Sequence, residues 1–186
     1  ENKLGIYLKF AFQDFYGQVK PSGTSDAIFQ TMNQYKELMK TRFLVCNCDN
    51  LYSANAMEIL KRENNYNSMI AYDYDCLDFS QKRLSSFSIL KIENNFLSEI
   101  IEKPDIEIIK TSNQKKYVSM NIFSFIGSKV YKYLKDCPIN KVRGEKELPS
   151  ALQNMILDDK ESIMTFPLCE HVPDMTYKDD IERINN

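Results

Sequence analysis

The first half of the chain alternates between two hydrophobic spacings. Apolar residues recur at helical spacing over 25–40 and over 53–62, and a serine that can act as an N-cap opens each stretch. The short apolar runs at 43–48 and 69–74 are typical of buried strands, and the first of them stops at a polar Asp-Asn pair. The order helix, strand, helix, strand predicts right-handed crossovers and a parallel sheet.

The second half combines shorter strands with helices. Residues 85–92 and 96–101 flank the sequence Glu-Asn-Asn, which favours a hairpin, and the polar stretch 105–116 predicts a loop. The other expected elements are strands at 117–125 and 162–167 and helices at 128–134, 147–157 and 178–184. No linker or internal repeat divides the chain. The pattern therefore predicts one α/β domain over 1–186 with a mixed, mainly parallel sheet.

Composition excludes two classes of partner. The 24 basic and 26 acidic residues give a net charge of −2, and no segment concentrates positive charge, so no nucleic-acid partner is expected. The longest apolar stretches are about six to eight residues, far shorter than a membrane span, so no membrane partner is expected either. We interpret the chain as a soluble globular domain.

The cysteines indicate the compartment. Five cysteines without framework spacing argue against a secreted disulfide scaffold, and we expect a reduced, cytoplasmic protein. Cys46 and Cys48 share one face of the expected strand, which suggests a metal site, but no second Cys/His pair completes it. Buried free thiols on a core strand are the favoured interpretation.

Four positions are candidates for chemistry on their local context. Asp49 directly follows the expected strand 43–48, where open α/β sheets bind ligands, so its carboxylate can hold Mg²⁺ or merely turn the chain. Gly23 and Thr24 lie just before a helix, where backbone N–H groups can face a ligand or form an ordinary turn. Lys103, next to Glu102, can meet a phosphate or form a solvated ion pair. His171 has no partner in the nearby sequence, and we interpret it as a structural or surface histidine.

Five motifs in order resemble the sugar-1-phosphate nucleotidylyltransferases, enzymes of the glucose-1-phosphate thymidylyltransferase type that make nucleoside-diphosphate sugars. The resemblance covers about Gln18 to Ile181, nearly the whole chain. The motifs are Gln18–Ala27, Val45–Tyr52, Glu102-Lys103-Pro104, Arg143–Leu152 and Pro173–Ile181. In the family they correspond to the base-binding segment, the strand that ends in the metal aspartate, the E-K-P motif, the R-G-E segment before a helix and the D-x-G-T-P-E-D-L ending.

The resemblance implies a role for each motif. Gln18 and the backbone at Gly23 and Thr24 would contact the nucleotide base. Glu102 would meet sugar hydroxyls and Lys103 the sugar phosphate. Further contacts with substrate are implied for Ser88, Ser119, Asn121 and Glu145. Asp49 and Asp174 would hold Mg²⁺, and with Lys103 they form the implied catalytic set.

The chain departs from the family pattern at several of these places. Cys48 stands where the family has a glycine before the metal aspartate, and Ser88 stands at the glycine that lets the backbone approach the sugar. Ser119 and Asn121 replace the usual Asn and Gly. The family's N-terminal Gly-rich loop, with its arginine and lysine, has no counterpart in this sequence. We therefore expect the first strand and that loop, roughly 50 to 80 residues, to be missing, and the chain alone to be inactive.

The resemblance implies a Rossmann-like, three-layer αβα domain of the GT-A type. The implied reaction transfers a nucleoside monophosphate from a nucleoside triphosphate to a sugar 1-phosphate and releases pyrophosphate. The implied cofactor is Mg²⁺, the partners are the nucleotide and the sugar phosphate, and a homo-oligomer is possible. Two alternatives stay open: the same chemistry on another phosphorylated acceptor such as phosphocholine, or a nucleotide-binding relative without catalytic activity.

Overall fold

The computed structural model describes residues 5–63, 65–102 and 115–176. The helices are α1 (Thr24–Gln34), α2 (Ala54–Arg62), α3 (Gln81–Leu84), α5 (Gly127–Lys135) and α6 (Leu148–Asp158), with the 3₁₀ turns η1 (Lys36–Lys40) and η2 (Tyr74–Cys76). The strands are β1 (Arg42–Cys46), β2 (Asn67–Asp73), β3 (Ile89–Glu93), β4 (Phe96–Ile101), β5 (Tyr117–Val118), β6 (Ile122–Ile126) and β7 (Ile163–Leu168). Residues 105–114 of the loop expected over 105–116 and the helix expected over 178–184 lie outside the described residues.

The sheet is mostly antiparallel and closes into a small barrel, so the expectation of a mainly parallel sheet was wrong. Its strand order is β1-β6-β2-β5-β3-β4-β7, and β7 pairs back onto β2. Only the β2–β7 pairing is parallel. The expected parallel direction of the first two strands is correct, since β1 and β2 point the same way. However, β6 comes from far along the chain and inserts between them with the opposite direction.

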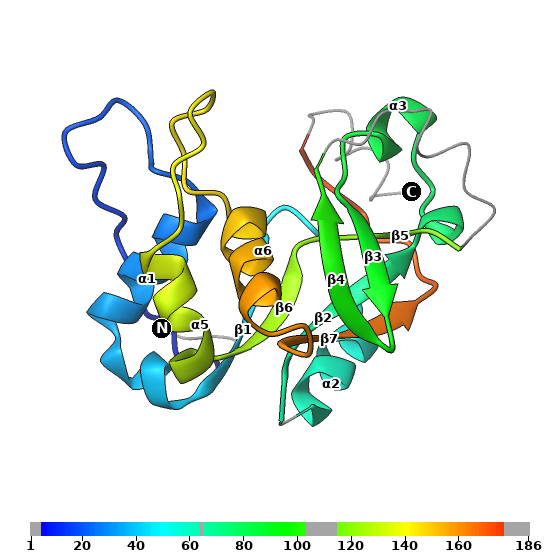
Figure 1. The fold of residues 1–186 in the computed structure, drawn as a ribbon, viewed down its shortest axis with the longest axis horizontal. Coiled ribbons are helices and arrows are strands. Elements are labelled where there is room, and N and C mark those ends of the chain that lie inside the picture. The colour runs from blue at the N-terminus through cyan, green and yellow to red at the C-terminus, as the bar shows by residue number, and fades with distance from the viewer. Residues whose placement is uncertain (1–4, 64, 103–114, 177–186) are drawn as a thin grey trace.

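The central strand β2 separates two hydrophobic cores. All seven of its residues are buried, and its alternating side chains point to opposite faces. Met69 and Ala71 pack in one core with α1, α5 and α6. Ile70 and Tyr72 pack in the other core with α2. Figure 1 shows these helices on the two sides of the sheet, which confirms the layered α/β arrangement.

Local signals set several element ends. Ser53 caps α2, as expected, because its Oγ accepts the Ala56 N–H at 3.0 Å. The β3–β4 hairpin turns through Asn94 and Asn95, both with positive φ, which is the conformation that suits a two-residue hairpin loop. The helix expected over 25–40 instead ends at Gln34 and continues as η1.

Three further expectations about boundaries were wrong. The N-cap of α1 is Gly23, and Ser25 is buried inside the helix. The strand expected from residue 85 begins at Ile89, because residues 81–84 form α3. The strand expected over 117–125 is divided into β5 and β6, since Asn121 takes a φ of 55° that no strand allows.

The cysteine predictions also need correction. Cys46 and Cys48 are exposed, not buried: Cys46 is the last residue of β1, which lies at the end of the strand order, and Cys48 lies in the loop after it. Cys76 and Cys169 form a disulfide, so the expectation of fully reduced thiols was wrong. The cytoplasmic prediction rested on that expectation and loses its support here.

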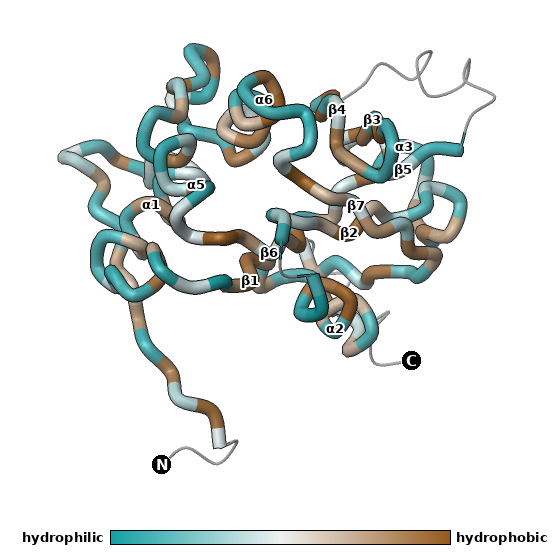
Figure 2. The backbone as a smooth tube through the Cα atoms, turned by 60° about the horizontal axis from the view of Figure 1, so that its bottom comes forward, coloured by the Kyte–Doolittle hydropathy of each residue, from teal (hydrophilic) through white to brown (hydrophobic). Residues whose placement is uncertain are grey.

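Hydrophobic residues also line the segment before α1. Figure 2 shows this segment leaving the body of the molecule with apolar residues along it, and Tyr7 and Phe12 are among its exposed side chains. Among the helices that the structure describes, none combines the length and the apolar character needed to cross a membrane.

Candidate functional site

Two chain segments meet where β1 ends. The loop after β1 carries Asp49, and the arm that follows β7, residues 169–176, carries Asp174. The Leu51 N–H donates to the Pro173 carbonyl at 2.9 Å, and the Met175 N–H donates to the Asp49 carbonyl at 2.7 Å. This short antiparallel bridge brings together two carboxylates that are 125 residues apart in sequence (174 − 49).

Both carboxylates line one cleft of about 660 Å³, which we call the carboxylate cleft. Its other walls are the α3 region, with Lys82 and Arg83, and the bend between β5 and β6. The resemblance implied substrate contacts for Ser119 and Asn121, and both line this cleft. The structure therefore brings four of the implied site residues to one place.

Tyr52 fixes the two loops that form the back of the carboxylate cleft. Its buried hydroxyl donates to the Met120 carbonyl at 2.6 Å and accepts the Asn47 N–H at 3.3 Å. Burial raises the pKa of this phenol, so it remains protonated and able to donate. The hydroxyl therefore ties the loop before Asp49 to the bend before Asn121.

Asp174 is almost fully buried and already has partners. Its Oδ1 accepts from the backbone N–H of Thr176 at 3.0 Å and from the Thr176 hydroxyl at 2.5 Å. Its Oδ2 lies 3.1 Å from Arg83 Nη2, and the same nitrogen donates to the Asp174 carbonyl at 3.1 Å. The guanidinium lies over the Phe79 ring, with its carbon 5.0 Å from the ring centroid. Sequence reasoning missed Arg83, because nothing in its local sequence connects it with residue 174.

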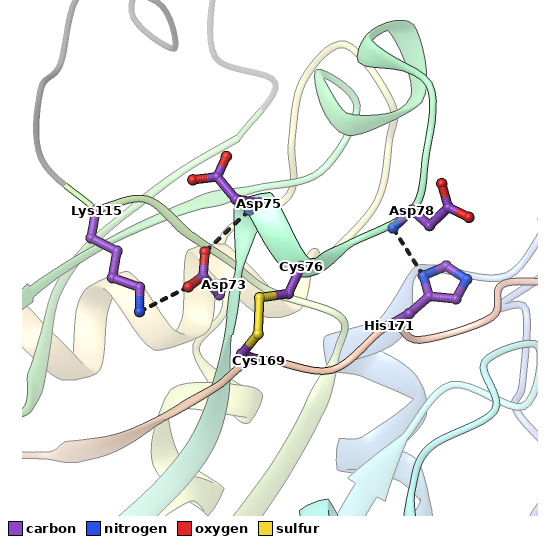
Figure 3. The surroundings of a disulfide bond; sticks show 7 residues. All are labelled: Asp73, Asp75, Cys76, Asp78, Lys115, Cys169 and His171. Carbon is purple, nitrogen blue, oxygen red and sulfur yellow. Dashed lines mark hydrogen bonds and ion pairs between the residues drawn. A yellow bond between two sulfur atoms is a disulfide. The ribbon is translucent and has the colours of Figure 1, made fainter.

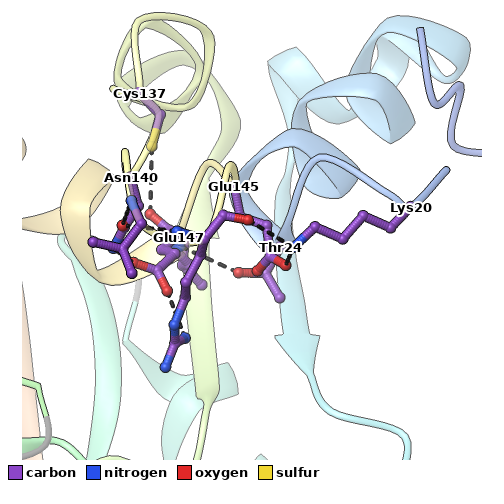
Figure 4. Close-up of polar contacts among 9 residues, drawn as sticks. Lys20, Thr24, Cys137, Asn140, Glu145 and Glu147 are labelled. Atoms are coloured by element: carbon purple, nitrogen blue, oxygen red, sulfur yellow. Dashed lines mark hydrogen bonds and ion pairs between the residues drawn. The ribbon is translucent and has the colours of Figure 1, made fainter. Parts of the chain in front are cut away.

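The glycine segment before α1 is held against the segment before α6. Ser25 N–H donates to the Lys146 carbonyl at 3.0 Å, and Lys146 N–H donates to the Ser22 carbonyl at 2.6 Å. The Leu148 N–H also donates to the Thr24 hydroxyl at 3.2 Å (Figure 4). Gly23 has a φ of 98°, and a Cβ there would lie 2.6 Å from the Lys146 carbonyl oxygen. Only glycine fits this conformation and this close approach.

These two segments form the wall of a second cleft of about 640 Å³, which we call the glycine cleft. Gly23, Thr24, Ser88, Glu102 and Glu145 line it. Ser119 and Asn121 line this cleft as well as the carboxylate cleft, so the two clefts adjoin.

The acidic residues of the glycine cleft are held by cations. Lys20 binds Glu145 at 2.6 Å, and this hydrogen bond lowers the pKa of the Glu145 carboxyl (Figure 4). Arg143 binds the buried Glu147 at 2.6 Å, and Glu147 also accepts from Asn140 at 2.7 Å. The R-G-E segment is therefore a rigid turn at the edge of the cleft, with its side chains fixed in place.

Gln13, which sequence reasoning missed, lines the glycine cleft, whereas the exposed Gln18 is not among the lining residues. The side-chain amide of Gln13 donates to the Gly23 carbonyl at 3.2 Å and to the buried Asp26 at 3.0 Å. Gln18 matches the family motif in its spacing along the sequence, but Gln13 is the glutamine that lies at the glycine cleft. The remaining implied residue, Lys103, lies outside the described residues.

The fit of Mg²⁺ depends on Asp49 and Asp174. Two carboxylates on one cleft suit an ion that prefers oxygen ligands and retains several waters. No group of three or more His, Cys, Asp or Glu side chains in the described ranges is arranged to hold a metal. The residues thus fit an ion bound by two carboxylates and by substrate phosphates, not an ion enclosed by the protein alone. Arg83 already neutralises one of the two carboxylates.

A disulfide anchors the start of the arm that carries Asp174, and Figure 3 shows its surroundings. It joins Cys76, just after β2, to Cys169, at the base of the arm that carries Asp174. Nearby, His171 Nδ1 accepts the Asp78 N–H at 3.2 Å and its ring contacts Phe79. Burial lowers the pKa of this imidazole, so the neutral form is favoured. These contacts agree with the structural role expected for His171.

Comparisons with known proteins give a family and a fold. The family model described as nucleotidyl transferase matches residues 1–167, a range that ends before Asp174. A crystal structure of a protein assigned as a glucose-1-phosphate thymidylyltransferase from Bacillus anthracis, in complex with sucrose, matches with a TM-score of 0.63 and 19% identity. The match covers 90% of this chain and 61% of that chain, and at this identity it indicates the fold alone. None of the curated protein sequences matches the chain.

Proposed function

The chain belongs to the nucleotidyl transferase family, and we propose that it supplies the base-, sugar- and metal-binding part of an enzyme that transfers a nucleoside monophosphate from a nucleoside triphosphate to a sugar 1-phosphate, with release of pyrophosphate. The observation that carries this proposal is the pair of adjoining clefts. One contains the two carboxylates, and the other contains the glycine segment and the R-G-E turn. A nucleotide and a phosphorylated sugar together need such a continuous site, with charge neutralisation at one end and hydrogen bonding at the other.

The glycine cleft suits the base and the sugars. Gly23 lets the segment before α1 pack closely against the backbone of Lys146, and the two segments together form one wall of the cleft. We assign the amide contact with the base to Gln13, in place of Gln18, because Gln13 lines the cleft and is oriented by Asp26. Thr24, Ser88, Glu102 and Glu145 line the same cleft and are proposed to contact the base or the sugar hydroxyls.

The carboxylate cleft suits the phosphates. Asp49 and Asp174 would hold Mg²⁺, which when bound supplies positive charge to neutralise the phosphate oxygens. The protein's own contribution is positional: the backbone bridge between the loop after β1 and the arm 169–176 fixes both carboxylates at one cleft. Ser119 and Asn121 border both clefts, where the reacting phosphates would meet. Lys103 remains the proposed partner of the sugar phosphate on the resemblance alone.

The acceptor, the metal and the assembly remain proposals on weaker grounds. The family suggests a sugar 1-phosphate, and phosphocholine uses the same type of phosphate group. We propose Mg²⁺ dependence and a homo-oligomer on the resemblance alone.

Asp49→Asn tests the proposed function. We would measure pyrophosphate release by a form of the protein that also carries the family's Gly-rich loop, with a panel of nucleoside triphosphates, each combined with glucose 1-phosphate, other sugar 1-phosphates or phosphocholine. Asp49→Asn should reduce the rate by roughly 100-fold or more, because it removes charge stabilisation at the reacting phosphates. The matched control is Asp136→Asn, an exposed carboxylate at the end of α5 that should leave the rate unchanged.

A direct binding measurement makes the test independent of turnover. Isothermal titration of the chain with each nucleoside triphosphate reports whether the glycine cleft binds a base, and Gln13→Ala should weaken that binding more than Gln18→Ala. Equal rates for Asp49→Asn and Asp136→Asn would contradict the assignment of Asp49. Absence of nucleotide binding by the wild-type chain would contradict the assignment of the glycine cleft.

A further inference from the structure

We propose that Arg83 is an internal competitor of the divalent cation: it pairs with Asp174 in the metal-free protein and thereby sets the affinity of the site for Mg²⁺. The inference rests on the proposed function in one respect, the use of Mg²⁺ at Asp49 and Asp174. The inference goes beyond the proposed function by naming a positioning residue that belongs to none of the five sequence motifs.

The contacts of Asp174 leave little capacity for a metal. An ionised carboxylate offers about four lone-pair directions. Thr176 uses two of them, through its backbone N–H and its hydroxyl, and the Arg83 guanidinium uses a third. Because the Asp174 side chain is only 9% exposed, water does not replace a lost partner easily. A cation that approaches Oδ2 must therefore displace the guanidinium or lie beside it.

The charge of the cleft supports the same conclusion. Among the described residues, the charged side chains that line it are two carboxylates, Asp49 and Asp174, and two cations, Lys82 and Arg83. The formal charge is therefore balanced without a metal. Arg83 is 13% exposed and lies against Phe79, so its charge is screened less than that of the exposed Lys82. Removing Arg83 leaves a buried carboxylate without its counter-ion, which favours binding of an external cation.

The position of Arg83 is set by the fold and not by a chance surface contact. The Ser80 hydroxyl accepts the Arg83 N–H at 3.3 Å at the start of α3, and the buried Leu84 anchors the same turn in the second core. The guanidinium also binds the Asp174 carbonyl, so it fixes the backbone of the arm as well as the carboxylate. Two attachments to one residue are typical of a positioning role.

The test is a titration of the substrate-free chain with Mg²⁺, in which calorimetry measures the binding affinity. Arg83→Met keeps the apolar stem over Phe79 and removes the charge, and it should tighten Mg²⁺ binding by roughly tenfold or more. Lys82→Met removes the same formal charge from the same cleft at an exposed position, and it should change the affinity by less than about threefold. Arg83→Lys retains a cation but cannot reproduce both contacts with Asp174, so its Mg²⁺ affinity should lie between those of the wild type and Arg83→Met. Asp174→Asn removes the carboxylate for which Arg83 and Mg²⁺ compete, so it should abolish both this competition and tight Mg²⁺ binding.

A wild-type measurement covers the case in which Arg83→Met does not fold. The side-chain Nε–H signal of Arg83, assigned in an NMR spectrum from its loss in Arg83→Lys, should shift during the Mg²⁺ titration with the same midpoint as calorimetry. The signal of Arg62, an exposed residue on α2, is the internal control and should stay fixed. Saturation with Mg²⁺ without a shift of the Arg83 signal would overturn the proposal, as would unchanged or weaker Mg²⁺ binding in folded Arg83→Met. Because none of these readouts uses nucleotide transfer, a failure of the proposed reaction would be recognised separately.

Discussion

The Cys76–Cys169 disulfide joins the end of β2 to the arm that carries Asp174, and replacing both cysteines by alanine should destabilise the protein strongly. The two cysteines are 93 residues apart in sequence. In the chain-entropy description, a closed loop of that size restricts the unfolded chain by about 4.6 kcal/mol at 25 °C. The parallel pairing of β2 with β7, up to Tyr72 and Leu168, persists without the disulfide. We therefore expect the free energy of unfolding to fall by about 2–4.5 kcal/mol.

Two measurements test this prediction. Thiol titration of the denatured, unreduced protein should give three free thiols, from Cys46, Cys48 and Cys137, and reduction should raise the number to the five of the sequence. Urea unfolding of Cys76→Ala/Cys169→Ala, compared with Cys46→Ala as the control for loss of a free thiol, then gives the energetic effect.

The reasoning would be refuted by five free thiols before reduction, since the disulfide would then be absent from the protein. Three free thiols together with an unchanged free energy of unfolding would refute the magnitude instead. In that case the unfolded chain would already be restricted by residual structure between the two cysteines.

Two further predictions concern backbone conformation and pH. Gly23→Ala should destabilise the protein more than Gly17→Ala by about 1 kcal/mol or more. Both positions have positive φ, but only the Cβ at 23 would meet backbone, the Lys146 carbonyl at 2.6 Å; equal urea midpoints would contradict this. Burial lowers the pKa of His171 in the folded state below 6.5, so the unfolded chain binds more protons and the free energy of unfolding falls as pH drops through about 6.5. His171→Gln should reduce this fall between pH 7.5 and 5.5, and an identical pH dependence in wild type and variant would argue against it.

Local signals predicted the elements well because they depend on neighbours in sequence. The Ser53 cap, the hairpin turn at Asn94–Asn95 and the strand β7 each follow from side-chain chemistry within a few residues. The relative direction of the strands, parallel or antiparallel, does not follow from neighbours in sequence. The insertion of β6 between β1 and β2 depends on a pairing between residues more than fifty positions apart, and apolar runs carry no information about their partners.

The same limit of local sequence signals applies to the exposure of Cys46 and Cys48 and to the choice of the glutamine proposed to contact the base. Cys46 and Cys48 were expected to be buried because their strand is apolar, but Cys46 is the last residue of β1 and Cys48 lies in the loop after it, and both are exposed. Gln18 has the motif spacing, yet Gln13 lines the glycine cleft because the chain between it and Gly23 bends back toward α1. Spacing in sequence determines position in space only inside a regular element, and residues 13–23 contain none.

The carboxylate cleft shows why a motif can locate ligands but not their electrostatic state. Asp49 was predicted from the end of its strand and Asp174 from the resemblance, and the structure places both on one cleft. Neither signal contained Arg83, which reaches Asp174 across 91 residues of sequence. A carboxylate that is paired with a buried guanidinium differs from a free one, because any metal must first overcome that pairing. We therefore expect the affinity of the proposed site for a cation to depend on Arg83 of α3 as much as on the two aspartates.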